Sequence, residues 1–275
     1  MTAELQEKEQ RLAGILTELD SVLVAYSGGV DSTFLLKKAL EVLGMEKVLA
    51  VVAQSDTYPA SEVRQAVELA SSLGAHLRLI HTNELNDENF IRNPINRCYY
   101  CKRELFNMLL EIARKEGYGW VAEGSNQDDL ADFRPGREAK EQLGVRSPLL
   151  EAGLTKQNIR ALSKEAALPT WDKPSFACLS SRFPYGIRIT PEQLRMVDEG
   201  EAFLKGLGFR QVRVRVHGQV ARVELEPSEM RRLVQDGLAS RVAVELKRIG
   251  FAYAALDLEG YRTGSMNEVL VEPRG

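Results

Sequence analysis

A short glycine-containing segment, Ser27-Gly28-Gly29-Val30-Asp31-Ser32, constrains the fold of this chain more than any other stretch. It follows a β-prone apolar run, Ser21–Tyr26, and precedes a segment with helical periodicity that ends at Gly44. Adjacent glycines let the backbone adopt positive φ and approach a ligand closely, and the amides and dipole of the following helix favour an anion. The sequence therefore predicts a strand, a phosphate-binding turn and a helix in direct succession.

The same order of strand and helix recurs up to about residue 167. Further strands are expected at Val48–Ala53, His76–Ile80, Trp120–Glu123 and Ser147–Leu150. Helices are expected at 4–19, Ser32–Leu43, Ser61–Leu73, Cys101–Lys115, Arg137–Leu143 and Thr155–Ala167. This alternation is typical of an α/β fold with a doubly wound parallel sheet, here of about five strands, which binds ligands beyond the carboxyl ends of its strands.

The pattern changes near Thr190. A helix at Pro191–Leu207, two alternating strands, two further helices and a last strand predict a smaller α+β domain; these later elements are expected at 211–216, 220–225, 227–235, 238–249 and 252–258. We expect a first domain of residues 1–185 and a second of residues 186–275.

Charge and hydropathy disfavour a nucleic-acid-binding, secreted or membrane protein. The 275 residues include 36 basic and 39 acidic side chains, a formal net charge of −3, so a nucleic-acid partner is not expected without a local basic patch. The charged N-terminal segment is unlike a signal peptide, and no apolar run approaches the roughly 20 residues that span a bilayer. We expect a cytoplasmic protein with no membrane partner.

The glycine turn lacks the lysine of a Walker A loop and the spacing of a dinucleotide-binding G-x-G-x-x-G loop. It could be a turn in which glycines only permit tight packing, but the full string resembles the PP-loop signature of ATP pyrophosphatases, the adenine nucleotide alpha hydrolase-like fold. The resemblance implies that Ser27, Gly28, Gly29 and Ser32 hold the β and γ phosphates of ATP, and that Asp31 lies near Mg²⁺. Ala53 is expected to line the adenine, and Gly124 to leave room beside the nucleotide.

Three cysteines, Cys98, Cys101 and Cys178, are too few and too unevenly spaced for a disulfide framework. The Cys-x-x-Cys pair lies at the start of a predicted helix, where the dipole favours thiolates. Three interpretations follow from the residues: buried packing residues, a zinc site or reactive thiols, or a [4Fe–4S] cluster with one iron that lacks a protein ligand. No histidine has the spacing of a fourth ligand.

Longer segments resemble the LarE family, ATP-dependent sulfurtransferases that build the nickel-pincer nucleotide. The similar segments are Lys173–Gly186, Val212–His217, Asp132–Gly136 and Leu256–Gly264, which extend the resemblance into the second domain. The resemblance implies that ATP adenylates a carboxylate of pyridinium-3,5-biscarboxylic acid mononucleotide and that sulfur then displaces AMP. It also adds Arg134 to the nucleotide-binding residues.

One subgroup of this family sacrifices the sulfur of a single cysteine, which would align with Ala177, so this chain departs from that pattern. The three cysteines instead resemble the subgroup in which Cys98, Cys101 and Cys178 hold a [4Fe–4S] cluster. A sulfide on an open iron can be replaced after each turnover, whereas a sacrificed cysteine cannot. The resemblance therefore implies Cys178, Asp31 and Ser181 as catalytic residues, a sulfide or sulfur donor as a partner, and a homo-oligomer.

The predicted hairpin of the second domain carries charges on one face. A turn at His217-Gly218 would pair Arg213 with Arg222 and Arg215 with Val220, leaving Glu224 to relieve only part of the repulsion. The face could be solvated, with its arginines splayed apart. An anion such as a nucleotide phosphate would also relieve it, so Arg213, Arg215 and Glu224, with Arg182 from the linker, are candidate substrate-binding residues.

Three other functions are compatible with parts of this pattern. Some PP-loop tRNA thiolases carry Cys-x-x-Cys and a cluster, but the acidic balance and the lack of a basic, aromatic-rich module disfavour tRNA. An amide-forming synthetase would need no thiols, and a nucleotide-binding module would release no pyrophosphate. The predicted function is ATP-dependent sulfur transfer.

Overall fold

A computed structural model describes residues 2–130, 136–174, 177–235, 237–262 and 264–270. The chain forms two compact units, Met1–Phe90 with Asn96–Phe176, and Ile91–Ile95 with Ala177–Gly275. Residues 177–185, expected in the first domain, thus cluster with the second unit. Within the described residues, no helix is both long enough and apolar enough to cross a membrane.

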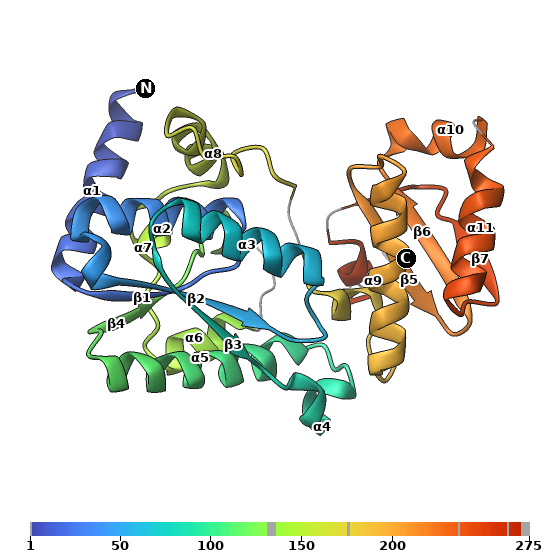
Figure 1. Cartoon of the computed structure of the whole chain (residues 1–275), viewed down its shortest axis with the longest axis horizontal. Coiled ribbons are helices and arrows are strands. Elements are labelled where there is room, and N and C mark those ends of the chain that lie inside the picture. Colours follow the sequence, from blue (N-terminus) through green and yellow to red (C-terminus); the bar gives the residue numbers. More distant parts are fainter. Residues whose placement is uncertain (1, 131–135, 175–176, 236, 263, 271–275) are drawn as a thin grey trace. The chain divides into compact units, whose positions relative to one another are not determined.

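The first unit is built on a parallel sheet with strand order β3-β2-β1-β4. Its strands are β1 (Val22–Ala25), β2 (Val48–Gln54), β3 (His76–His81) and β4 (Trp120–Ala122). Figure 1 shows helices on both faces of this sheet: α1 (Ala3–Leu19), α2 (Val30–Leu43), α3 (Ala60–Ser72), α7 (Pro148–Glu151) and α8 (Lys156–Glu165) on one, and α5 (Arg97–Glu116) and α6 (Gly136–Gln142) on the other. The predicted doubly wound α/β architecture is confirmed.

Both faces of the sheet are buried, which explains why β1 and β2 are almost continuously apolar. Val24, Ala50 and Val52 pack with α1, α2 and α3, whereas Leu23, Leu49 and Val51 pack with Leu105, Phe106 and Leu109 of α5. The two cores pack against opposite faces of the central strands and so fix the position of the loops at their carboxyl ends.

The fifth strand predicted at Ser147–Leu150 is wrong. Only an isolated bridge joins Arg146 to Ala122, and Pro148 then begins helix α7. Proline lacks the N–H group that a strand ladder needs, and its fixed φ suits the first turn of a helix. The described sheet therefore has four strands.

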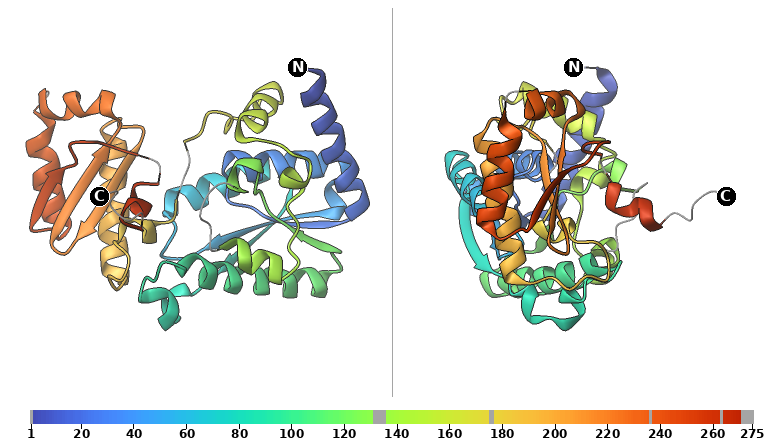
Figure 2. Two further views of the ribbon diagram at one scale, coloured as in Figure 1. Left: turned by 180° about the vertical axis from the view of Figure 1, so that it is seen from behind. Right: turned by 90° about the vertical axis from the view of Figure 1, so that its right-hand side faces the viewer.

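The second unit contains a sheet of order β5-β6-β7, from β5 (Val212–His217), β6 (Val220–Leu225) and β7 (Tyr253–Leu256). Helices α9 (Pro191–Gly206) and α11 (Leu238–Ile249) cover one face, as both views of Figure 2 show, and Gly200 of α9 lies against Leu246 and Val214. Helix α10 (Pro227–Gln235) links β6 to α11. Residues 91–95, which include the end of α4 (Glu88–Ile91), join this unit through bonds from Gly186 and Ile189 N–H.

The register of the β5–β6 hairpin differs from the prediction. Arg213 pairs with Glu224, and Arg215 pairs with Arg222, because the turn is Gly218-Gln219. Two-residue hairpin turns need positive φ at the first central residue, and Gly218, with φ of 59°, provides it. The pairing shifts by two residues, so the predicted faces are unchanged and the apolar face is buried.

Candidate functional site

The turn between β1 and α2 needs glycine at position 28. Gly28 has φ of 68°, and a Cβ atom there would lie 2.7 Å from Cβ of Ala66 in α3. Gly29 caps α2 in extended conformation, and its carbonyl accepts from Thr33 N–H at 2.9 Å. The turn is therefore pressed between β1 and α3, with the amino end of α2 open for an anion.

The two serines of the turn are bonded to each other. Ser32 Oγ lies 3.1 Å from Ser27 Oγ, accepts from Ser27 N–H at 3.3 Å and donates to the Gly29 carbonyl at 3.3 Å. These bonds hold both hydroxyls beside the first turn of α2. The predicted phosphate ligands Ser27, Gly28, Gly29 and Ser32 thus form one local structure.

This turn lies where the strand order reverses, between β1 and β4. In doubly wound sheets, ligands bind at that position. A Cβ atom on Gly124 would lie 3.0 Å from Ser32 N and 3.3 Å from Asp31 Cβ. Gly124 is therefore needed because the loop after β4 packs against the start of α2; a contact with the nucleotide stays a prediction.

Two lysines that sequence analysis did not single out contact the turn. Lys156, the first residue of α8, forms an ion pair with Asp31. Lys173 donates to the Gly28 carbonyl at 3.3 Å and pairs with Glu62 at 2.8 Å. The available signals were the Thr155 cap before Lys156 and the position of Lys173 at the start of the segment that carries Cys178.

Ala53, the predicted adenine contact, is half-buried near the carboxyl end of β2, where it pairs with Ile80 of β3. Arg134 lies outside the described residues. At the end of β4, the buried carboxylate of Glu123 accepts from Ser147 Oγ at 2.5 Å and Lys140 Nζ at 3.2 Å. Burial opposes its ionisation, but Lys140 and the neighbouring hydroxyls prevail and lower the pKa of Glu123. This ion pair was not predicted, and it anchors the loop that carries Gly124.

The Cys-x-x-Cys pair lies in the first turns of α5. Cys98 is exposed, and the half-buried Cys101 donates from Sγ to Glu84 Oε1 at 3.7 Å. Residues at i and i+3 share a helix face, so one ligand can reach both sulfurs. Cys178, half-buried, lies in the other compact unit, directly before the short helix η4 (Leu179–Arg182). Among the described residues, no group of three or more His, Cys, Asp or Glu forms a metal-binding cluster.

Arg182 supports the loop that carries Cys178. The side chain is fully buried and pairs with Glu201 of α9 at 2.7 and 2.8 Å. Its Nη1 donates to the carbonyls of Ala177 and Cys178 and to Ser181 Oγ, the last at 2.7 Å. Protein acceptors thus occupy this guanidinium, so a direct contact between Arg182 and substrate stays a prediction.

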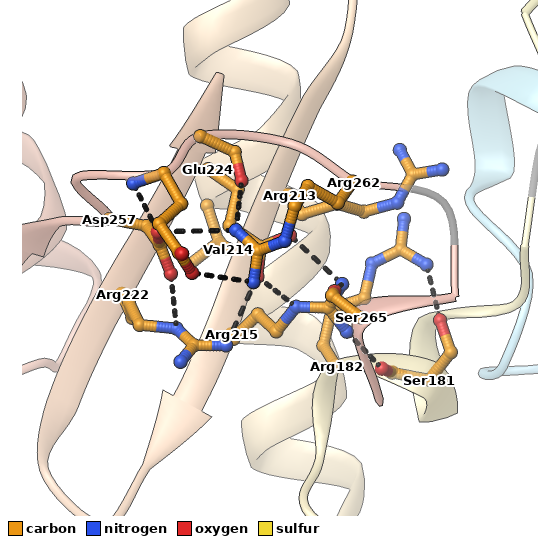
Figure 3. A network of polar contacts seen from close by, with 12 residues as sticks. Ser181, Arg182, Arg213, Val214, Arg215, Arg222, Glu224, Asp257, Arg262 and Ser265 are labelled. Carbon is orange, nitrogen blue, oxygen red and sulfur yellow. Dashed lines mark hydrogen bonds and ion pairs between the residues drawn. The ribbon is translucent and has the colours of Figure 1, made fainter. Parts of the chain in front are cut away.

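Three charged residues on the polar side of the β5–β6 hairpin, Arg213, Arg215 and Glu224, are buried. Figure 3 shows the network of polar contacts around them. Arg215 pairs with Glu224 at 2.5 and 2.9 Å and donates to the Ser181 carbonyl and to Ser265 Oγ, each at 2.8 Å. Arg222 bridges Glu224 and Asp257. These side chains come from strands β5 and β6, from helices η4 and α9, and from the residue directly after β7. We call this set the arginine face: Arg182, Arg213, Arg215, Arg222, Glu201, Glu224 and Asp257.

Arg213 lies in surroundings that disfavour its charge. Burial and the nearby Arg182 lower the pKa of Arg213, and Glu201 offsets only part of this. Its guanidinium stacks on the Tyr261 ring, 5.0 Å from the centroid, and donates to the Val212 carbonyl. The arginine face has four cations and three carboxylates, so its chemistry suits an anion.

Comparisons with known proteins match the first part of the chain in one case and nearly the whole chain in two others. The NAD synthase family model matches residues 8–123, which include the glycine turn. A pyridinium-3,5-bisthiocarboxylic acid mononucleotide synthase of Lactiplantibacillus plantarum is 39% identical over 272 residues, which cover 98% of this chain and 97% of that protein. An uncharacterized protein of Synechocystis sp. is 44% identical over 268 residues, covering 98% of this chain and 100% of that protein. A tRNA-specific 2-thiouridylase of Desulforamulus reducens is 27% identical over 195 residues, covering 56% of this chain and 52% of that protein.

Proposed function

This chain belongs to the LarE family of ATP-using sulfurtransferases, and on that premise we propose that it transfers sulfur to pyridinium-3,5-biscarboxylic acid mononucleotide. The product would be the thiocarboxylate precursor of the nickel-pincer nucleotide. The observation that carries the proposal is the match over both units to the L. plantarum synthase, since the tRNA thiouridylase matches only 56% of the chain.

The first half-reaction uses the glycine turn. Ser27, Ser32 and the amides at the start of α2 hold the β and γ phosphates of ATP, and the Asp31 carboxylate suits Mg²⁺, which prefers oxygen ligands. A carboxylate oxygen of the substrate attacks the α-phosphorus, the bond between the α-phosphorus and the bridging oxygen breaks, and pyrophosphate leaves. The acyl adenylate that remains is activated at its carbonyl carbon.

The second half-reaction needs a sulfur nucleophile. Three thiols, two of them on one face of α5, suit a cluster with one iron that lacks a protein ligand. A [4Fe–4S] cluster held by Cys98, Cys101 and Cys178 would supply a replaceable sulfide. Sulfide adds to the carbonyl carbon, the bond from that carbon to the AMP oxygen breaks, and AMP leaves a thiocarboxylate.

The arginine face is the proposed site for the phosphate of the mononucleotide. Three of its arginines, Arg182, Arg213 and Arg215, are buried, so an anion beside them would be screened weakly by water and would relieve the repulsion between Arg213 and Arg182. Ser181 connects this face to Cys178, because Arg215 bonds the Ser181 carbonyl and Arg182 bonds both Ser181 and Cys178. We therefore keep Ser181 as a proposed catalytic residue.

Purification without oxygen tests the sulfur source. We expect brown protein with a broad band near 400 nm and about four irons per chain. Cys98→Ala, Cys101→Ala and Cys178→Ala should each lose the colour but still bind ATP, so ATP binding is the control for folding. Colourless protein with stoichiometric zinc would refute the cluster and leave the adenylation step intact.

A pyrophosphate-release assay separates the candidate substrates. Release is expected with the pyridinium mononucleotide and not with tRNA, which should also fail to bind filters with this protein at physiological salt. Release that requires tRNA would overturn the proposed substrate and favour a tRNA thiolase. Release that requires ammonia, with an amide as product, would favour the synthetase chemistry of the NAD synthase family.

A further inference from the structure

Lys156 pairs with Asp31, the carboxylate that the proposed function assigns to Mg²⁺. Asp31 is the second residue of α2, and its side chain is 21% exposed. The lysine that pairs with it comes from 125 residues later in the chain and is 33% exposed. A protein cation therefore lies at Asp31.

The backbone of Lys156 is held by contacts other than the ion pair with Asp31. Its N–H donates to Asp128 Oδ2 at 2.8 Å, and the preceding Thr155 forms a capping box with Asn158. Asp128 belongs to the loop after β4, on the far side of the switch point from α2. These contacts would hold the backbone of Lys156 beside the glycine turn even without the ion pair to Asp31.

Lys173 also contacts the glycine turn, but it pairs with groups other than the proposed metal ligand Asp31. Its ammonium pairs with Glu62 of α3 and with the Gly28 carbonyl, and neither group is a proposed ligand of the metal. Binding of Mg²⁺ would leave those contacts intact. Among the two lysines at the turn, only Lys156 must leave its carboxylate when the metal arrives.

From this geometry, which rests on the proposed function for the role of Asp31, we propose that Lys156 and Mg²⁺ exchange at Asp31. In the absence of ATP, Lys156 neutralises Asp31 and competes with free divalent metal. When metal-bound ATP enters, the metal takes the carboxylate and the released ammonium binds the phosphates. Lys156 is then a positioning residue that makes the site accept the metal together with ATP rather than alone.

Mn²⁺ titration followed by electron paramagnetic resonance tests the exchange, with and without ATP. Lys156→Met should bind free Mn²⁺ about three- to tenfold more tightly than wild type, because the competing cation is gone. The same variant should bind Mn²⁺–ATP about tenfold more weakly, because a charge-assisted phosphate contact is lost. Lys156→Arg keeps the charge and should stay within about twofold of wild type for free Mn²⁺.

Lys164→Met is the matched control. Lys164 is exposed on the same helix, about 12 Å further along its axis, and stacks on Trp171, so it should change neither affinity. Unchanged or weaker binding of free Mn²⁺ by Lys156→Met, or unchanged binding of Mn²⁺–ATP, overturns the exchange. Wild-type protein that fails to bind Mn²⁺–ATP overturns the proposed function itself, so the two failures are distinguishable.

Discussion

The two proposed anion sites of this protein are built in opposite ways. The glycine turn uses backbone amides and two serines from one segment of six residues, with a helix end open to the ligand. The arginine face uses buried charged side chains from distant segments, each held by a partner such as Glu201 or Glu224. The first site depends on local conformation, and the second depends on charge balance inside the fold.

This difference predicts that the second unit is the more sensitive to loss of a single charge. Glu201→Ala would leave the fully buried Arg182 without its bidentate partner, and breaking a buried pair in this way costs about 3–5 kcal/mol. Urea unfolding measures the change, with Glu245→Ala as a control that should lose much less stability, because the partner of Glu245 is the exposed Arg248. Equal losses for both variants would contradict the proposed dependence on buried charge.

The glycine turn should instead be most sensitive to a change in its backbone conformation. Gly28→Ala places a side chain at positive φ and 2.7 Å from Ala66 Cβ, so we expect a loss of about 1–3 kcal/mol in stability. ATP binding should fall more than tenfold, because the amides no longer point at the phosphates. Gly14→Ala is the control, since Gly14 lies within α1 and has nothing near its Cβ position.

A double variant that also removes the side chain of residue 66 separates the effect of crowding at position 28 from the effect of backbone strain. Gly28→Ala combined with Ala66→Gly removes the closest contact, at 2.7 Å, and leaves the strain of positive φ with a contact of 3.0 Å to the Cα atom of residue 66. Partial recovery of ATP affinity is expected. Full recovery would show that crowding alone, and not backbone conformation, makes glycine necessary.

The same contrast explains what the sequence could predict. Ser27–Ser32 is contiguous, so its residues reveal the turn, and all four strands of the sheet and its longer helices were expected within a few residues. Lys156 and Lys173 reach the turn from 125 and 145 residues away, and the local signals at these lysines do not predict which residues they contact. Contacts of that kind are determined by packing and not by periodicity.

The arginine face shows a second limit. Shifting the hairpin register by two residues leaves every side chain on the same face, so the apolar pattern could not distinguish the predicted pairing from the observed one. The choice depended on Gly218 at the turn. Likewise, burial of Arg182 against Glu201 follows from the position of α9, which the sequence does not encode locally.

Acid should weaken both units, through a different carboxylate in each. Burial opposes ionisation of Glu201 and Glu123, but Arg182 and Lys140 respectively outweigh it and lower each pKa below 4.5. A lowered pKa in the folded state gives stability that is present above pH 4.5 and is lost as the pH falls through the folded pKa. Glu201→Gln and Glu123→Gln should therefore each show a shallower fall in the free energy of unfolding below pH 4.5 than wild type. Parallel pH profiles for wild type and both variants would contradict this assignment.

The smallest effect on stability is expected at Arg213, whose surroundings disfavour its charge. Arg213→Met removes a buried cation whose pKa burial and Arg182 already lower, so the free energy of unfolding should change by less than about 1 kcal/mol. Binding of the pyridinium mononucleotide, measured by calorimetry, should nevertheless weaken about tenfold, while ATP affinity stays unchanged. Arg241→Met, at an exposed position on α11, is the control and should alter neither. A variant that loses stability but keeps its affinity for the mononucleotide would show that Arg213 supports the fold. The arginine face would then not be the site that binds the anion through its charge.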